Sequence, residues 1–157
     1  MELTATQDVE APQQALFRAM MDFDRIEAQL AGSRIDLHRQ HGPAADAPLG
    51  TRWVARFRLR GEDRRATVTL CELVAPDRVV LDGAMGGLEA RSAVTLDPLD
   101  TARTRVTAAV MLHPGTLSAR LMLQSLRLAR GTIEARFRAR SAQVFEAFGA
   151  AAREAGA

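Results

Sequence analysis

The stretch 52–60 has the clearest periodicity in the chain, because large apolar residues and arginines alternate along it. Trp53, Ala55, Phe57 and Leu59 occupy every second position, and the positions between them are arginine except for one valine. Successive side chains of a strand point to opposite faces of a sheet. The period of two therefore predicts a strand with one apolar face and one arginine-rich face.

Other apolar patterns predict that strands fill most of the first two thirds of the chain. Six further stretches indicate strands, namely 3–9, 35–37, 66–70, 79–82, 88–96 and 104–112. Short turns that contain glycine, or proline with aspartate, separate the later ones. Parallel strands need long crossovers, so the short connections favour an antiparallel meander.

Two short helices are predicted between the first and the second strand. Pro12 is tolerated in a first helical turn, where its missing N–H costs no hydrogen bond, and Leu16 follows at helical spacing. Asp24 can cap a second helix that carries Ile26 and ends at Gly32.

The stretch 116–152 contains no proline and few β-branched residues. It predicts one C-terminal helix about 55 Å long, with Gly131 as its bend point. One stripe at the helical period is apolar and consists of Met122, Leu126, Ala129, Ile133, Phe137, Val144 and Phe148. Arg120 and Arg127 fall on the opposite side. Arg140 lies on the apolar stripe itself.

These elements predict an α+β fold in which a curved antiparallel sheet of about seven strands wraps around the long C-terminal helix. The two short helices follow the first strand, and one domain spans residues 1–157. A sheet with one apolar face must cover that face. Small residues occur at many inward positions, namely Ala55, Ala66, Ala90, Ser92 and Ala108. They favour a cavity between sheet and helix; alternatively, the helix lies closer to the sheet.

Composition places the chain among globular proteins, with 47% hydrophobic and 25% charged residues. The apolar runs are too short to span a membrane, and the N-terminus shows no secretory signal pattern. We therefore expect a cytoplasmic protein. Its uniform use of arginine, alanine and leucine is typical of a GC-rich bacterial genome. Cys71 is the single cysteine, which excludes an internal disulfide, and we interpret it as a filler within a strand.

The basic residues are all arginine, but the net charge is only +2. Residues 1–50 carry four arginines and eight acidic residues, whereas residues 116–157 carry seven arginines and three acidic residues. No aromatic residue interleaves the arginines of the sheet for base stacking, so we expect no nucleic-acid partner. A solvated or partner-facing sheet surface is the preferred interpretation. It leaves room for weak dimerisation, and we expect a monomer or a weak homodimer.

Several short motifs follow one another along the chain: Val9-Glu10-Ala11-Pro12 before Leu16-Phe17 and Asp22-Phe23, then Gly50-Thr51-Arg52-Trp53, Ala75-Pro76-Asp77-Arg78, and Leu96-Asp97-Pro98 before Thr104-Arg105-Val106. In order and spacing they resemble the helix-grip superfamily, also called SRPBCC or START-like, which includes polyketide cyclases and lipid-transfer domains. The resemblance covers essentially the whole chain. It implies a pocket for a hydrophobic or amphipathic small molecule or lipid between the sheet and the long helix.

The residues expected to line that pocket are Phe23, Ile26, Leu30, Trp53, Ala55, Phe57, Val68, Leu70, Ala90, Val94, Val106, Ala108, Val110, Leu126, Ile133, Phe137 and Arg140. A buried arginine needs a partner or a ligand. Strand parity places Glu72 on the same face as Val68, which makes it a candidate partner of Arg140. Arg140 is either a ligand anchor or, as we prefer, part of a structural ion pair or a side chain that reaches solvent.

No catalytic residue, metal site or cofactor is predicted. His38 and His41 have no cysteine or carboxylate at metal-ligand spacing, and no nucleophile-elbow or nucleotide-binding motif is present. A surface role is the preferred interpretation of these two residues and of His113, and a histidine general base is the alternative. The preferred function is the binding or transport of a hydrophobic small molecule. A cyclase or dehydratase would need polar residues to converge in the pocket, the candidates being Arg140, Glu72, Asp82 and Asp22. A protein-interaction module that uses the arginine-rich sheet face is a third alternative.

Overall fold

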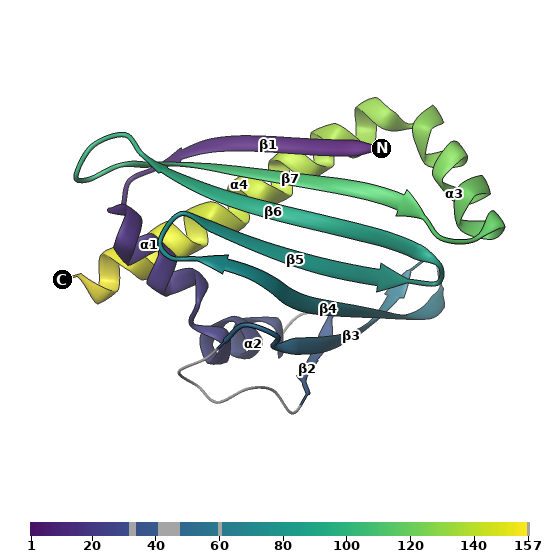
Figure 1. The fold of residues 1–157 in the computed structure, drawn as a ribbon, viewed down its shortest axis with the longest axis horizontal. Helices are drawn as coiled ribbons and strands as arrows, with labels where there is room; N and C mark the ends of the chain where they lie inside the picture. Colours follow the sequence, from purple (N-terminus) through teal and green to yellow (C-terminus); the bar gives the residue numbers. More distant parts are fainter. Residues whose placement is uncertain (32–33, 41–47, 60, 157) are drawn as a thin grey trace.

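The computed structural model describes residues 1–31, 34–40, 48–59 and 61–156 (Figure 1). Its elements in chain order are β1 (Glu2–Val9), α1 (Gln13–Met20), α2 (Phe23–Ala31), β2 (Asp36–Arg39), β3 (Arg52–Leu59), β4 (Glu62–Val74), β5 (Arg78–Met85), β6 (Leu88–Pro98), β7 (Thr104–Pro114), α3 (Leu117–Leu128) and α4 (Arg130–Ala155). The predicted α+β class and helix-grip architecture are confirmed.

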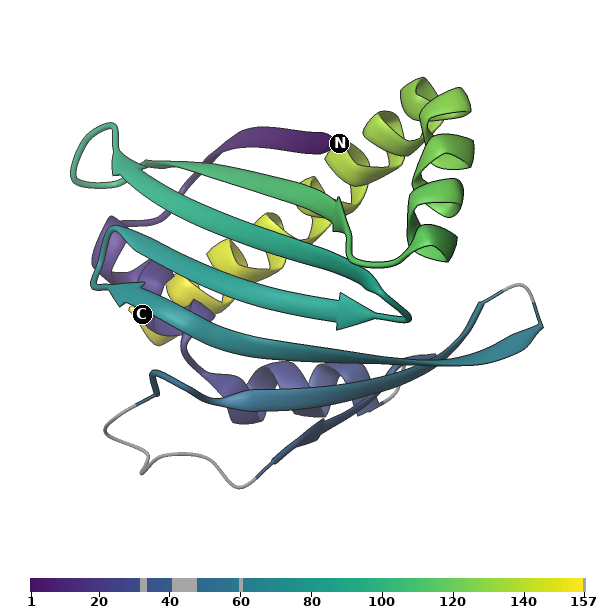
Figure 2. The same cartoon turned by 45° about the vertical axis from the view of Figure 1, so that its right-hand side comes forward.

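All seven strands form one antiparallel sheet in the order β1-β7-β6-β5-β4-β3-β2. From β2 to β7 each strand pairs with the next one in the chain. Short turns make the pairings from β3 to β7, whereas a longer connection leads from β2 to β3. The N-terminal strand β1 pairs with β7 and forms one edge of the open sheet, and β2 forms the other edge. Figures 1 and 2 show α4 crossing behind the curved sheet.

Strand alternation produces the two faces that the sequence predicts. Trp53 lies opposite Val68, and both side chains are on the concave face that α2 and α4 cover. The arginines of the convex face, such as Arg56, are exposed. The sequence pattern also predicts the arginine-rich outer face for Arg64, but Arg64 lies opposite Phe57 and so has the parity of the concave face. Arg60 lies outside the described residues.

A β-bulge in β4 changes the parity of the strand between Leu70 and Glu72. Leu70 pairs with Leu81 and Leu73 pairs with Val79, so both leucines have concave-face parity although they are three residues apart in the sequence. Glu72 is thereby turned to the convex face. The prediction that Glu72 lies on the face of Val68 is wrong for this reason.

The predicted single C-terminal helix is two helices. Ala129 has φ −107° and ψ 23°, which ends α3, and α4 begins at the next residue. The break falls two residues before Gly131, at a residue with high helix propensity. Met122 and Ala129 are consequently exposed and do not belong to an inward stripe, while Leu126 is half-buried.

α4 approaches β1 closely at Gly149, which is buried. A Cβ atom on Gly149 would lie 2.6 Å from Cγ1 of Val9, a core residue that is 1% exposed. Glycine is therefore required here for contact distance rather than for an unusual backbone conformation. No helix among the described residues is long and apolar enough to cross a membrane.

We predict that Gly149→Ala lowers the free energy of unfolding by about 1–2 kcal/mol, because the new methyl group overlaps Val9. The matched control is Gly131→Ala in the same helix, where a Cβ meets nothing within 4 Å. That variant should be stabilised by up to about 1 kcal/mol. Urea denaturation measures both values, and equal stabilisation by the two substitutions would contradict the close packing of α4 on β1.

Candidate ligand-binding pocket

A pocket of about 370 Å³ lies between the concave face of the sheet, the α1–α2 segment and the C-terminal half of α4. Its lining consists of hydrophobic residues, namely Met20, Met21, Phe23, Ile26, Leu37, Trp53, Val68, Leu70, Val79, Leu81, Val94, Val144 and Phe148. Six of them come from the adjacent strands β3, β4, β5 and β6. Leu70 and Val79 are buried, whereas Val144 is 42% exposed and lies at the rim.

The pocket contains six of the predicted lining residues, namely Phe23, Ile26, Trp53, Val68, Leu70 and Val94. Its lining does not include the other predicted residues: Leu30, Ala55, Phe57, Ala90, Val106, Ala108, Val110, Leu126, Ile133, Phe137 and Arg140. Val106 and Ala108 belong to the same buried core as Trp53 and Leu70 but do not line the pocket. Contact of any of these residues with a ligand stays a prediction.

Arg140 is exposed on α4, and Glu72 pairs with Arg78 at 3.5 Å. The predicted Arg140–Glu72 pair is therefore wrong. The bulge accounts for Glu72, as described above. For Arg140 the reason is the path of the inward stripe, which runs through Ser141 and Phe145 and leaves Arg140 about 100° to one side.

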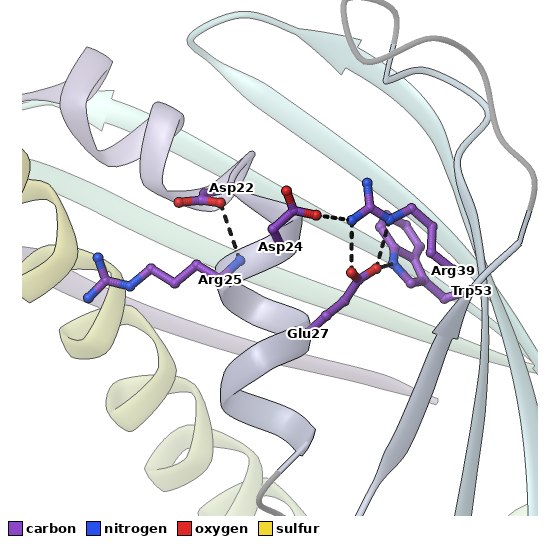
Figure 3. Close-up of polar contacts among 6 residues, drawn as sticks. All are labelled: Asp22, Asp24, Arg25, Glu27, Arg39 and Trp53. Carbon is purple, nitrogen blue, oxygen red and sulfur yellow. Dashed lines mark hydrogen bonds and ion pairs between the residues drawn. The ribbon is translucent and has the colours of Figure 1, made fainter.

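A polar cluster joins α2 to β2 and β3 beside the pocket (Figure 3). Both guanidinium donors Nε and Nη2 of Arg39 lie 2.8 Å from the carboxylate oxygens of Glu27. The indole Nε1–H of Trp53 donates to the same carboxylate at 3.0 Å, and Asp24 also pairs with Arg39. We call Asp24, Glu27, Arg39 and Trp53 the α2 clamp.

The α2 clamp also orients an aromatic wall of the pocket. Phe23 packs edge-on against Trp53 with ring centroids 5.0 Å apart, and the guanidinium of Arg39 lies 5.7 Å from the Phe23 centroid. The hydrogen bonds between Arg39 and Glu27 lower the pKa of the Glu27 carboxyl and raise the pKa of the Arg39 guanidinium. Both groups are charged at neutral pH, and the two carboxylates offset the single cation.

Sequence reasoning missed the α2 clamp. Asp24 was expected to cap the second helix, but Asp22 has that role and its Oδ1 accepts the N–H of Arg25 at 3.3 Å. Two features of the sequence indicate the α2 clamp. Asp24 and Glu27 are three residues apart on one helical face, and Arg39 has the inward parity of Leu37.

The remaining candidate groups are dispersed over the surface. His38 contacts Asp36 at 3.0 Å on β2, and His113 is exposed on β7; His41 lies outside the described residues. Asp82 pairs with Arg91 on the convex face. The described part of the chain contains no group of three or more histidine, cysteine or acidic residues that could hold a metal ion.

No family model matches the sequence, and no curated protein matches it either. Solved structures do match it. Ara h 8.0201 has a TM-score of 0.65 at 12% identity, covering 98% of both chains. The aromatase/cyclase Zhui from a Streptomyces species has a TM-score of 0.61 at 12% identity, covering 86% of this chain and 88% of that one. A START superfamily protein from Mycobacterium smegmatis has a TM-score of 0.56 at 13% identity, covering 86% and 95%.

These similarities confirm the resemblance at the level of the fold. The chain has the helix-grip fold of SRPBCC or START-like proteins. Sequence identities this low carry no substrate or catalytic residue from those proteins to this one.

We predict that Glu27→Gln lowers the free energy of unfolding at pH 7 by about 1–2 kcal/mol, because it removes a bidentate charged contact and weakens the acceptor of Trp53. The fluorescence of Trp53, the single tryptophan, should change in the native state. The control is Glu154→Gln, which removes an exposed partner of Arg25 and should cost less than about 0.5 kcal/mol. Equal effects of the two substitutions would show that the clamp does not hold α2.

The contribution of Glu27 to the free energy of unfolding should decrease as the pH falls. Its pKa is lowered in the folded state, so its stabilisation is complete above the ordinary glutamate pKa of about 4.3 and is lost as the pH falls through the lowered value. The stability difference between wild type and Glu27→Gln should therefore be constant from pH 7 to pH 5 and shrink below pH 4. Denaturation at a series of pH values measures it, and a difference that grows on acidification would contradict the assignment.

Proposed function

We propose that the protein binds a neutral hydrophobic or amphipathic small molecule in the pocket between the sheet and α4. The observation that supports this is the lining of the pocket: thirteen hydrophobic residues enclose a volume of about 370 Å³. That volume is within the range of small-molecule sites. Water in such a pocket finds few hydrogen-bond partners, so an apolar ligand replaces it favourably.

The chemistry of the lining also defines the ligand class. A charged group inside the pocket would lose its hydration without a compensating partner. The ionic side chains of the α2 clamp contact the lining residues Phe23 and Trp53, but Arg39 is already paired with Asp24 and Glu27. A polar end of the ligand therefore lies at the rim near Val144, where solvent reaches it, and its apolar body lies against Leu70 and Val79.

Among the residues that the structure describes, the pocket lining offers no group that favours the alternative of a cyclase or dehydratase. General acid–base catalysis needs a titratable group within hydrogen-bond reach of the substrate. The polar candidates do not converge on the pocket: Arg140 is exposed, Asp82 and Glu72 pair with arginines of the convex face, and Asp22 caps α2. Cytoplasmic location, a monomeric or weakly dimeric state and the lack of a nucleic-acid partner stay predictions.

A neutral fluorescent probe tests the proposal. N-phenyl-1-naphthylamine should bind with saturable fluorescence enhancement, and Val68→Phe should weaken that binding about tenfold or more by filling the pocket. The control is Val110→Phe, because Val110 is also a half-buried valine of the concave face but lies outside the lining. It should change the affinity less than about twofold. Absence of saturable binding, or equal effects of the two substitutions, would contradict the proposed site.

A further inference from the structure

α3 presents a row of leucines to solvent. Leu117, Leu121 and Leu128 are 72%, 58% and 92% exposed. At 100° per residue they fall within about 40° of arc, so they form one stripe along the full length of the helix. We call these three residues the leucine stripe. Isolated exposed leucines are ordinary, but a contiguous row of them on one helix indicates an interaction surface.

The orientation of the leucine stripe is fixed by the opposite side of α3. Ala119 and Leu123 are buried beneath the helix, at 1% and 3% exposure. The Thr116 hydroxyl caps the helix by accepting the N–H of Ala119 at 3.1 Å. Gly115 donates its N–H to Gly87 at 2.7 Å and ties the helix start to the β5–β6 turn. Figures 1 and 2 both show α3 at the periphery of the molecule, beyond the end of β7.

Positive charge is concentrated in the same part of the chain. Residues 117–140 carry six arginines and one glutamate, whereas the rest of the chain carries fifteen arginines and eighteen acidic residues. Arg120 and Arg127 lie on one flank of the leucine stripe, about 60–120° from its members. Both are exposed, and α3 itself contains no acidic residue. The surface is therefore apolar and cationic together.

We propose that α3 docks the protein on the surface of an anionic lipid bilayer. The helix lies in the plane of the interface, the leucine stripe enters the boundary between headgroups and acyl chains, and Arg120 and Arg127 bind lipid phosphates. The surplus of arginine around α3 supplies the attraction to the negative surface. This binding is peripheral, in keeping with the absence of a membrane-spanning helix among the described residues.

Charge and composition favour a bilayer over other occupants. A second copy of the chain packed stripe to stripe would bring two sets of like-charged arginines together at a desolvated contact. Nucleic acid would use the arginines but would leave the leucines unburied, and α3 carries no aromatic residue for stacking. An anionic bilayer satisfies the leucines and the arginines at once.

Vesicle co-sedimentation tests the proposal with the full chain. Wild-type protein should partition onto phosphatidylcholine vesicles that contain 30% phosphatidylglycerol, should bind pure phosphatidylcholine at least about tenfold more weakly, and should be released by salt. Leu121→Asp/Leu128→Asp should reduce partitioning onto the anionic vesicles at least about tenfold. Arg120→Gln/Arg127→Gln should reduce both partitioning and its salt dependence.

Two matched controls separate α3 from the rest of the surface. Met111→Asp replaces an exposed apolar residue of β7 on the convex face of the sheet, and Arg56→Gln/Arg65→Gln removes two exposed arginines from the convex face. Both should bind anionic vesicles within about twofold of wild type. Circular dichroism and thermal unfolding establish that every variant is folded, and the probe assay above shows independently whether the apolar pocket is intact.

Several results would overturn the proposal. One is failure of the wild-type protein to bind anionic vesicles. Another is that Leu121→Asp/Leu128→Asp partitions onto anionic vesicles as strongly as wild type, because charged residues outside the leucine stripe would then account for the binding. A third is a lipid-free wild-type dimer, detected by analytical ultracentrifugation, that this variant converts to monomer, because the leucine stripe would then be a self-association surface.

Discussion

The structure depends on how α4 covers the apolar face of the sheet. A curved seven-stranded sheet is too wide for one helix, and α4 packs against β1 and α1. The close approach of Gly149 to Val9 holds it there. The concave surface of β3, β4 and β5 is covered by α1 and α2 together with the C-terminal half of α4, and this cover is incomplete. The pocket is the space that remains.

The α2 clamp explains how a short helix can form the other side of that space. α2 buries no residue completely, so hydrophobic packing alone holds it weakly. Glu27 accepts three hydrogen bonds from residues of β2 and β3, and Asp24 forms an ion pair with Arg39 of β2. These contacts supplement the packing. The same contacts satisfy the Trp53 N–H, which lets its ring face an apolar pocket without an unpaired donor.

Most of the fold could be predicted from the sequence, because alternation with period two determines which face of a strand is buried. The stretch around Trp53 is the clearest case. The errors arose where a local event changed the periodicity. The bulge after Leu70 inverted the parity of Glu72, and the break at Ala129 ended a helix without glycine or proline to mark it. Arg140 was misplaced because its 100° offset from Ser141 separates a half-buried position from an exposed one.

The pocket was predicted less completely than the fold, because its position depends on where α4 lies across the sheet. Inward parity identified Trp53, Val68, Leu70 and Val94 as concave-face residues, but it identified Val106 equally, and Val106 is buried outside the pocket lining. Side-chain direction is a property of each strand. The lateral position of a helix depends on long-range packing that no single stretch of sequence contains.

The contrast between α4 and α2 has a consequence for the range of molecules that the pocket can admit. α4 is held at a glycine with no room for an added methyl group, so this wall is rigid toward β1. α2 has no fully buried side chain and is attached largely through charged groups near the surface. A molecule larger than the pocket would displace α2 rather than α4. Size tolerance is therefore set by a nine-residue helix, while the floor of the pocket keeps its shape.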